Sequence, residues 1–171
     1  PVNGGKAAQI TTNAAYDTHP VWSPDGKQIA FASDRMGSMD IFVVDREGGI
    51  PKRLTTHSGN ETPVAFKDAD HILFLANVMP SAEDAQFPSG QFQQVYEVST
   101  TGDRPVMFSS MPMEDISINK TGNALLYHDK KGYEDPWRKH HTSSITRDIW
   151  LCSLDGKRSY RKLTSFNGED R

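Results

Sequence analysis

WSPDGKQIAF, residues 22–31, joins two short runs of strand-forming residues through a Ser-Pro-Asp-Gly turn. In such a turn Pro24 presets φ, Asp25 hydrogen-bonds to the backbone two residues on, and Gly26 supplies a positive φ. The Trp, Ile and Phe residues on either side are types enriched in β-strands. The stretch therefore predicts a tight β-hairpin whose turn residues serve folding.

The hairpin phrase occurs three times, and repeats of this kind define an architecture. The copies align without gaps as HPVWSPDGKQIAF (19–31), TPVAFKDADHILF (62–74) and DISINKTGNALLY (115–127). Pro20 then falls on Pro63. Phe31, at the end of the phrase, falls on Phe74 and Tyr127. The second copy lacks the turn glycine, so we expect its turn to differ.

A second phrase follows each copy of the first. It reads DIFVVDREGGIPKRLTT (40–56), QVYEVSTTGDRPVMFSS (94–110) and DIWLCSLDGKRSYRKLTS (148–165). The result is three units of four short segments, rich in β-branched and aromatic residues and bounded by turn residues. Four antiparallel strands that recur every ~40 to 50 residues match the blade of a β-propeller. The sequence therefore predicts an all-β fold, a partial β-propeller of about three four-stranded antiparallel blades.

The first unit also has apolar residues on both faces of a strand. Ile29 and Phe31 alternate with Ala30 and Ala32, as expected for a strand that is covered on two sides. A free-standing antiparallel sheet would present a polar face instead. A β-sandwich also has many short strands, but it does not explain the repeated phrases.

The repeats predict one partial propeller domain over residues 1–171. Its parts are the outer strand of a preceding blade (1–12), three blades (13–56, 57–110 and 111–165) and the start of a further blade (166–171). Closed propellers have roughly four to eight blades. We therefore expect the remaining blades of a longer chain as partners, two copies that complete a ring, or a cap that residues 1–12 form on the array in another way. Exposed blade faces predict self-association.

Composition and charge restrict the partners. The chain has 171 residues, enough for one ordinary domain, and a net charge of −3 from 19 Lys plus Arg against 22 Asp plus Glu. This charge gives no general reason to expect nucleic acid. No run approaches the ~20 apolar residues of a membrane-spanning helix. Cys152 is the single cysteine, which excludes an internal disulfide and a cysteine-rich metal site.

Two stretches resemble known propellers. HPVWSPDGKQIAFASDRMGSMDIFVVDREGGIPKRLTT (19–56) is similar to the WD-like blade repeat of TolB-type and tricorn-protease propellers. KHHTSSITRDIWLCSLDGKRSYRKLTSFNGEDR (139–171) resembles the amino-terminal six-bladed propeller of tricorn-like peptidases. This resemblance implies a non-catalytic module of a large serine peptidase, in which the propeller filters or docks polypeptides and the serine nucleophile lies far downstream.

Two other classes stay open. A TolB-like propeller of the cell envelope would dock partner proteins with no peptidase attached. A prolyl-oligopeptidase-like hydrolase would use its propeller to cover an active site. The sequence leaves the compartment undefined, and the resemblance favours the cell envelope.

Long connections identify a candidate binding rim. The link between the second and third strands is short in the first unit (34–39) but long in the other two (77–92 and 129–146), and in a propeller these links leave one rim. The expected contacts for a bound polypeptide are Phe87, Phe92, Tyr133, Trp137, Arg138, His140, His141 and Arg147. The aromatic residues among them are typical interface anchors. The alternative is that these loops pack on neighbouring blades.

We expect no catalytic residue, cofactor or metal in this chain. His140 and His141 are adjacent, so on a strand they would point to opposite faces and would need other ligands to close a metal site. Ser143 and Ser144 lie near His141 in the sequence, but no strained elbow or oxyanion-type glycine arrangement accompanies them. Packing or loop hydrogen bonding is the expected role of the histidines.

Other polar positions are assigned to structure. Asp40 and Asp148 both precede the third strand of their units, and this recurrence predicts a structural hydrogen bond to a neighbouring strand. Asp34 and Arg35 are expected to pair locally. Cys152 follows Ile-Trp-Leu in an apolar run, which predicts a buried, unreactive thiol.

Overall fold

The computed structural model describes residues 4–77, 93–129 and 147–165. The strands in these ranges are β1 (Asp17–Trp22), β2 (Gln28–Ser33), β3 (Asp40–Asp45), β4 (Lys52–Arg53), β5 (Glu61–Phe66), β6 (His71–Ala76), β7 (Gln94–Ser99), β8 (Val106–Ser109), β9 (Met113–Ile118), β10 (Ala124–Asp129), β11 (Ile149–Ser153) and β12 (Ser159–Lys162). The described residues contain no helix, and hence none that could cross a membrane. The predicted all-β class is confirmed.

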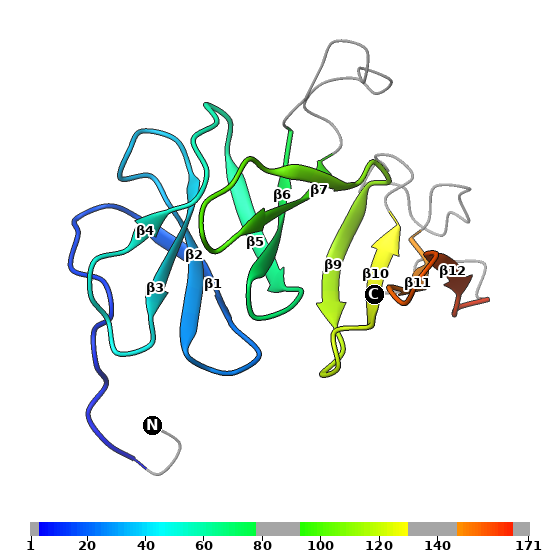
Figure 1. Ribbon diagram of the computed structural model, residues 1–171, viewed down its shortest axis with the longest axis horizontal. Coiled ribbons are helices and arrows are strands. Elements are labelled where there is room, and N and C mark those ends of the chain that lie inside the picture. Colours follow the sequence, from blue (N-terminus) through cyan, green and yellow to red (C-terminus); the bar gives the residue numbers. More distant parts are fainter. Residues whose placement is uncertain (1–3, 78–92, 130–146, 166–171) are drawn as a thin grey trace, which may run out of the picture.

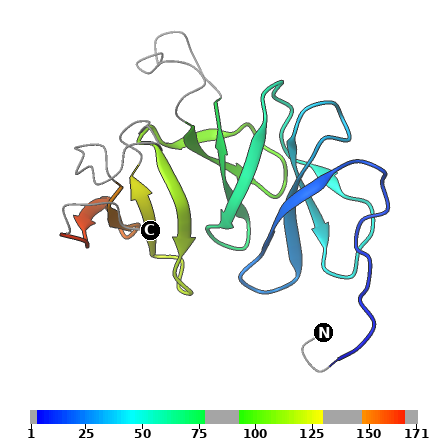
Figure 2. The same cartoon turned by 180° about the vertical axis from the view of Figure 1, so that it is seen from behind.

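The strands form three antiparallel sheets of four, each in chain order: β1-β2-β3-β4, β5-β6-β7-β8 and β9-β10-β11-β12. The sheets stand side by side like a fan (Figures 1 and 2). Their first strands are neighbours, because β1 contacts β5 and β5 contacts β9. Meander sheets arranged around adjoining first strands are the blades of a propeller. The predicted partial propeller of three four-stranded blades is therefore confirmed.

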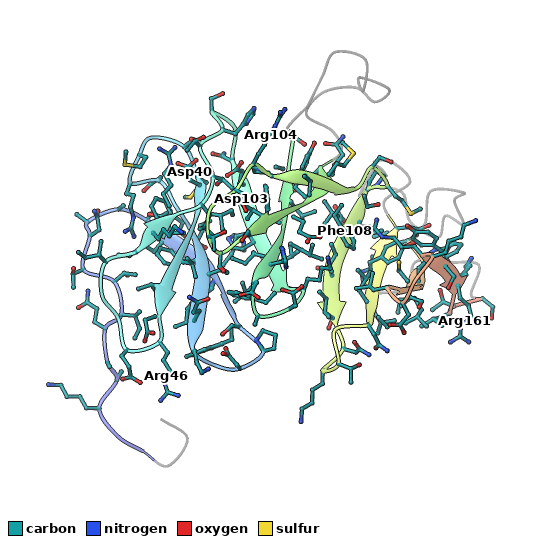
Figure 3. The ribbon with its side chains drawn as sticks, viewed as in Figure 1. Asp40, Arg46, Asp103, Arg104, Phe108 and Arg161 are labelled. Carbon is teal, nitrogen blue, oxygen red and sulfur yellow. The ribbon has the colours of Figure 1, made fainter. Side chains whose placement is uncertain are left out.

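Apolar side chains fill the space between neighbouring sheets. Between the first and second sheets, Ala30 belongs to the same buried cluster as Phe74 and Tyr96, whose stacked rings have centroids 5.7 Å apart. The corresponding cluster between the second and third sheets contains Phe108 and Tyr127, and Figure 3 shows Phe108 at that position. Covering on both faces explains why apolar residues occupy successive positions of the same strand.

The first and third hairpin turns share one geometry. The Gly26 amide donates to the Ser23 carbonyl at 2.9 Å, and the Gly122 amide donates to the Asn119 carbonyl at 3.0 Å. Both glycines have a positive φ, 68° and 72°. The turn chemistry inferred from Ser-Pro-Asp-Gly is confirmed.

The second turn differs, as its missing glycine predicts. Residues 67–70 connect β5 to β6, one residue fewer than 23–27 between β1 and β2. In this turn the Asp68 side chain accepts the backbone amide two residues on, at 2.8 Å. Because the turn is shorter, β5 is displaced by one position, and the gapless equivalence of Pro20 with Pro63 is wrong.

Each first strand carries a β-bulge. In β1 and β9 the bulge includes a non-glycine residue at positive φ, His19 at 52° and Asp115 at 51°. The same position in β5 is occupied by Pro63, whose ring holds φ near −65°. The bulge of β5 consequently falls on Val64, which lies between the paired residues on either side.

The segment before β1 forms no strand among the described residues, so its role as the outer strand of another blade stays a prediction. Two of its side chains nevertheless repeat contacts made by Leu54 and Thr55, which follow β4. Ile10 packs on the outer face of the first sheet. Thr11 hydrogen-bonds to the Asp17 side chain, as Thr55 does to Glu61.

Candidate functional site

The sheets have two distinct ends. The hairpin turns 23–27, 67–70 and 119–123 lie along the lower edge of the fan in Figure 1, and the second strands β2, β6 and β10 end at the upper edge. Figure 3 marks both ends of β3, with Asp40 at the upper edge and Arg46, just after the strand, at the lower edge. We call these edges the loop end and the turn end.

The recurring aspartates at the loop end bind neighbouring strands. Asp40 pairs with Arg53 on β4 at 2.7 Å. Asp148, directly before β11, pairs with Lys162 on β12 at 2.8 Å. Both carboxyl groups are buried, with residue exposures of 0% and 2%. The predicted structural bond to an adjacent strand is confirmed in the form of an ion pair.

The second sheet has uncharged residues at both of these positions. Gln94 stands where the first sheet has Asp40, and Met107 stands where it has Arg53. Anion and cation are replaced together, since a buried charge without its partner is strongly destabilising. An ion pair at this position is therefore not required for a sheet of this kind to form.

A groove opens at the turn end, with a cavity volume of about 490 Å³. It crosses the ends of β1, β5 and β9, and Val21, Val64 and Ile116 give it an apolar floor. At its edge, Trp22 leaves 59% of its surface exposed. Exposed aromatic rings beside an apolar floor are typical of binding surfaces.

Charges of both signs lie at the edge of the groove. Lys67 is paired with both carboxylate oxygens of Glu97 at 2.9 Å, and Asp68 is paired with His71 at 2.9 Å. Burial acts against ionisation of Asp68, but hydrogen bonds from a backbone amide and from His71 lower its pKa. Lys120 is exposed at the same edge and forms no ion pair with the described residues.

Of the residues predicted to contact a polypeptide, Arg147 lies in the described ranges. Its guanidinium pairs with Glu114 on β9 at 3.1 Å, so it lies at the loop end of the third sheet. Next to this pair, His128 on β10 contacts Asp115 at 3.0 Å. The other predicted contacts lie outside the described residues: Phe87, Phe92, Tyr133, Trp137, Arg138, His140 and His141.

The residues considered for metal binding or nucleophilic catalysis lie partly in the described part of the chain. No group of three or more His, Cys, Asp or Glu side chains within 4–77, 93–129 and 147–165 could hold a metal ion. Ser143 and Ser144 lie outside these ranges. Cys152 is 0% exposed and burial raises its pKa, so the prediction of a buried thiol is confirmed.

The sequence analysis did not identify the groove. Its floor comes from strands that are far apart in the chain, and no local pattern reports that they converge. One signal was available, because Trp22 ends β1 directly before a tight turn, where a side chain has few covering neighbours. A large aromatic residue at such a position indicates either packing against another strand or binding.

Repeated four-stranded meander sheets with adjoining first strands define this chain as part of a β-propeller. The family whose model matches residues 1–171 is the tricorn protease N-terminal beta propeller domain, and the chain belongs to this family. The resemblance to TolB-type and tricorn-type propellers found in the sequence is confirmed.

Curated relatives include two tricorn homologues. The chain is 37% identical over 155 residues to tricorn protease homolog 1 of Streptomyces coelicolor, which covers 91% of this chain and 14% of that protein. It is 25% identical over 174 residues to the tricorn protease homolog of Saccharolobus solfataricus, which covers 95% of this chain and 14% of that protein. The chain thus spans about a seventh of the length of these relatives.

Solved structures share the fold. A putative TolB from Agrobacterium tumefaciens matches with a TM-score of 0.63 and 20% identity, over 99% of this chain and 58% of that one. The tricorn protease matches with a TM-score of 0.57 and 17% identity, over 90% of this chain and 15% of that one. At these identities the likeness concerns the fold alone.

Proposed function

We propose that this propeller segment docks or gates polypeptides for a tricorn-type peptidase and has no bond-breaking chemistry of its own. The groove at the turn end carries the proposal. An extended polypeptide presents apolar side chains and backbone polar groups together, which suits an apolar floor edged by an indole and by polar turn residues. Membership of the tricorn propeller family supports the same class of ligand.

Charge supports a polypeptide over a nucleic acid. The chain carries a net charge of −3, whereas nucleic-acid sites concentrate basic residues to neutralise phosphates. At the groove, Lys67 is already neutralised by Glu97. Lys120 is the cation available there among the described residues, so a polypeptide with one acidic residue near its apolar anchor suits the groove best.

The eight residues predicted at the loop end form a proposed second contact region. Of the described residues near the long loops, Ala76, Gln94 and Asp129 lie at strand ends on this edge, and Arg147 lies two residues before β11. A polypeptide that follows the adjoining first strands would meet the loop end and the turn end in succession. Gating requires such a path.

Peptide binding tests the proposal. A pool of unstructured, fluorescently labelled peptides is titrated with protein, and affinity is read from fluorescence anisotropy. Trp22→Ala is expected to weaken binding at least about fivefold, because aromatic anchors typically contribute more than ~1 kcal/mol. Tyr160→Ala is the matched control, since Tyr160 is an exposed aromatic residue on β12, away from the groove.

The outcomes separate the two contact regions. Unchanged affinity in Trp22→Ala combined with a loss in Trp137→Ala would move the site from the groove to the loop end. No measurable binding of any peptide by the wild type would contradict polypeptide docking itself.

A cleavage assay tests the non-catalytic part of the proposal. The same peptides, incubated with the chain, are expected to remain intact by mass spectrometry. Turnover that disappears in Ser143→Ala or Ser144→Ala would show that the chain has catalytic chemistry.

A TolB-like role in the cell envelope is the second candidate. The Tol-Pal system protein TolB of Syntrophus aciditrophicus is 49% identical over 55 residues, which is 32% of this chain. In this role the propeller docks a folded partner protein and no peptidase is attached. Affinity for one folded envelope protein, without affinity for the peptide pool, would favour this candidate over gating.

A further inference from the structure

The seam between the first and second sheets contains a buried acidic side chain. Glu61, the first residue of β5, leaves 1% of its surface exposed. Its Oε2 is hydrogen-bonded to Oγ1 of Thr55, and its Oε1 has no hydrogen-bond partner among the described residues. Its backbone N–H donates to the Met39 carbonyl of the first sheet's loop end at 2.8 Å. The carboxyl group therefore lies inside the contact between two sheets.

Two charged side chains face Glu61 from the first sheet. Asp40 on β3 and Arg53 on β4 pair with each other at 2.7 Å, with side-chain exposures of 0% and 29%. From its own sheet, β6 presents Ala76 opposite Glu61. The cluster thus holds two carboxyl groups and one guanidinium, and that guanidinium is already paired. Ionised Glu61 would add an uncompensated negative charge in a buried place, which is unfavourable.

The acidic residues of the adjoining first strands have their own cations. Asp17 occupies in β1 the place of Glu61 in β5, and it pairs with Arg35 at 2.9 Å. The expected local pairing of Asp34 and Arg35 is wrong, because Arg35 binds a carboxylate 18 residues away across the sheet. Burial acts against ionisation of Asp17, but hydrogen bonds from neighbouring side chains and the charge of Arg35 lower its pKa. On β9, Glu114 pairs with Arg147. Glu61 differs from both because its nearest cation is committed to another carboxylate.

The seam between the second and third sheets contains no charge at the same positions. The residues that correspond to Asp40, Arg53, Thr55 and Glu61 are Gln94, Met107, Ser109 and Met113. The last correspondence follows from strand register, because Glu61 and Met113 each pair with the final residue of the next strand. The molecule therefore includes an uncharged counterpart of the cluster.

We propose that the seam between the first and second sheets is a proton-sensitive contact, which is tight while Glu61 is a neutral acid and loosens when Glu61 loses its proton. One guanidinium does not neutralise two buried carboxylates, so ionisation of Glu61 favours separation of the sheets or entry of water. Burial raises the pKa of Glu61 to about 7, with a contribution from the charge of Asp40 and against the effects of Thr55 and Arg53. Glu61 therefore loses its proton in the folded chain near neutral pH.

The direction of the pH effect follows from linkage. The pKa of Glu61 in the folded chain, about 7, lies above its ordinary value of 4.5. The contribution of protonated Glu61 to the free energy of unfolding is therefore fully present below about pH 4.5 and is lost as the pH rises to about 7. Across this window the unfolding equilibrium constant is expected to increase about tenfold per pH unit through this group alone.

Carboxyl titration by ¹³C NMR tests the proposal in the wild-type protein. Glu61 is expected to titrate with a midpoint near 7 rather than near its ordinary 4.5. In Asp40→Asn, Arg53 becomes available to Glu61, and the midpoint is expected to fall. A wild-type midpoint near 4.5, or a midpoint that Asp40→Asn leaves unchanged, would overturn the two-carboxylate explanation.

Amide hydrogen exchange locates the loosening. Wild type is compared with Glu61→Gln at equal pH, so that intrinsic exchange rates cancel. At pH 8 the amides of Ile41 and Glu61, which bond across the seam or beside it, are expected to exchange more than about a hundredfold faster in the wild type, and only about fourfold faster at pH 5, close to where the effect begins. The amide of Val95, at the second seam, is expected to show no difference at either pH.

Glu61→Met provides a second neutral variant, with the residue that β9 carries at this position. It is expected to match Glu61→Gln in its insensitivity to pH between 5 and 8. Equal exchange changes at both seams would overturn the proposal, because they would indicate a global effect of charge. The same pH dependence of unfolding in wild type and in both variants would also overturn it.

Discussion

Gly26 and Gly122 have the same left-handed backbone, yet their surroundings differ. A Cβ atom on Gly26 would meet nothing within 4 Å, whereas one on Gly122 would lie 2.9 Å from the carbonyl oxygen of Lys67. Gly26 is therefore required for the conformation of its turn alone. Gly122 is required for conformation and also for close packing of the third turn against the second, at the edge of the groove.

Alanine at these two glycines is expected to separate the two requirements. Gly26→Ala is expected to destabilise the chain by about 1–2 kcal/mol, through left-handed backbone strain. Gly122→Ala is expected to cost a further ~1–3 kcal/mol, because the new methyl group overlaps the Lys67 carbonyl and the turns must move apart. Urea denaturation measures both losses, and equal losses would contradict the contact between the turns.

At the scale of elements, one pair of positions joins the third strand of each sheet to its fourth strand at the loop end, and this pair shows how charge is tolerated there. The three sheets carry it as Asp40 with Arg53, Gln94 with Met107, and Asp148 with Lys162. The same strand geometry therefore occurs with an ion pair or with a neutral pair at these positions. A single charge there would be destabilising, since a buried charge loses hydration without a compensating partner.

Exchanging the pair of the first sheet for that of the second tests this rule. Arg53→Met alone is expected to destabilise the chain by about 3–5 kcal/mol, because it leaves Asp40 buried and unpaired. Arg53→Met combined with Asp40→Gln is expected to recover most of this loss. Thermal and chemical unfolding of the single and double variants give the coupling energy, and a double variant as unstable as Arg53→Met would contradict the rule.

The whole molecule is a set of sheets that cover one another, and the third sheet has an apolar face without a covering sheet among the described residues. Leu54 is 5% exposed beneath the second sheet, whereas Leu163, at the same position in the third sheet, is 44% exposed. Leu126, in the middle of β10, is 40% exposed on this face. We expect this face to pack against a further sheet, either of the same protein or of a second copy.

The 171-residue chain is consequently expected to self-associate. Sedimentation velocity over a range of concentrations should show a rising mass, and Leu126→Lys with Leu163→Lys should lower it, because charged groups are unfavourable in an apolar contact. Ile50→Lys is the control, since Ile50 is 97% exposed in the link between β3 and β4, away from this face. A monomer at every concentration would contradict packing of this face against a second copy.

Most of the fold could be read from single stretches of sequence. The turn at Gly26, the four-strand repeat and the buried position of Cys152 follow from preferences that act over a few residues: allowed φ angles, strand alternation and turn hydrogen bonds. The sequence alignment missed the displacement of β5, because the length of the turn after Phe66 is known only once β5 is paired with β6. The candidate residues of the long loops stay predictions.

The sequence by itself determined the strands, their grouping in fours and the propeller class, because each of these depends on neighbours along the chain. Only the tertiary structure decided that Val21, Val64 and Ile116 share one groove, and that Glu61 lies beside an arginine already paired with Asp40. Both depend on distances between residues from different sheets. Those distances, and the burial that makes charge pairing matter, exist only after the sheets have packed together.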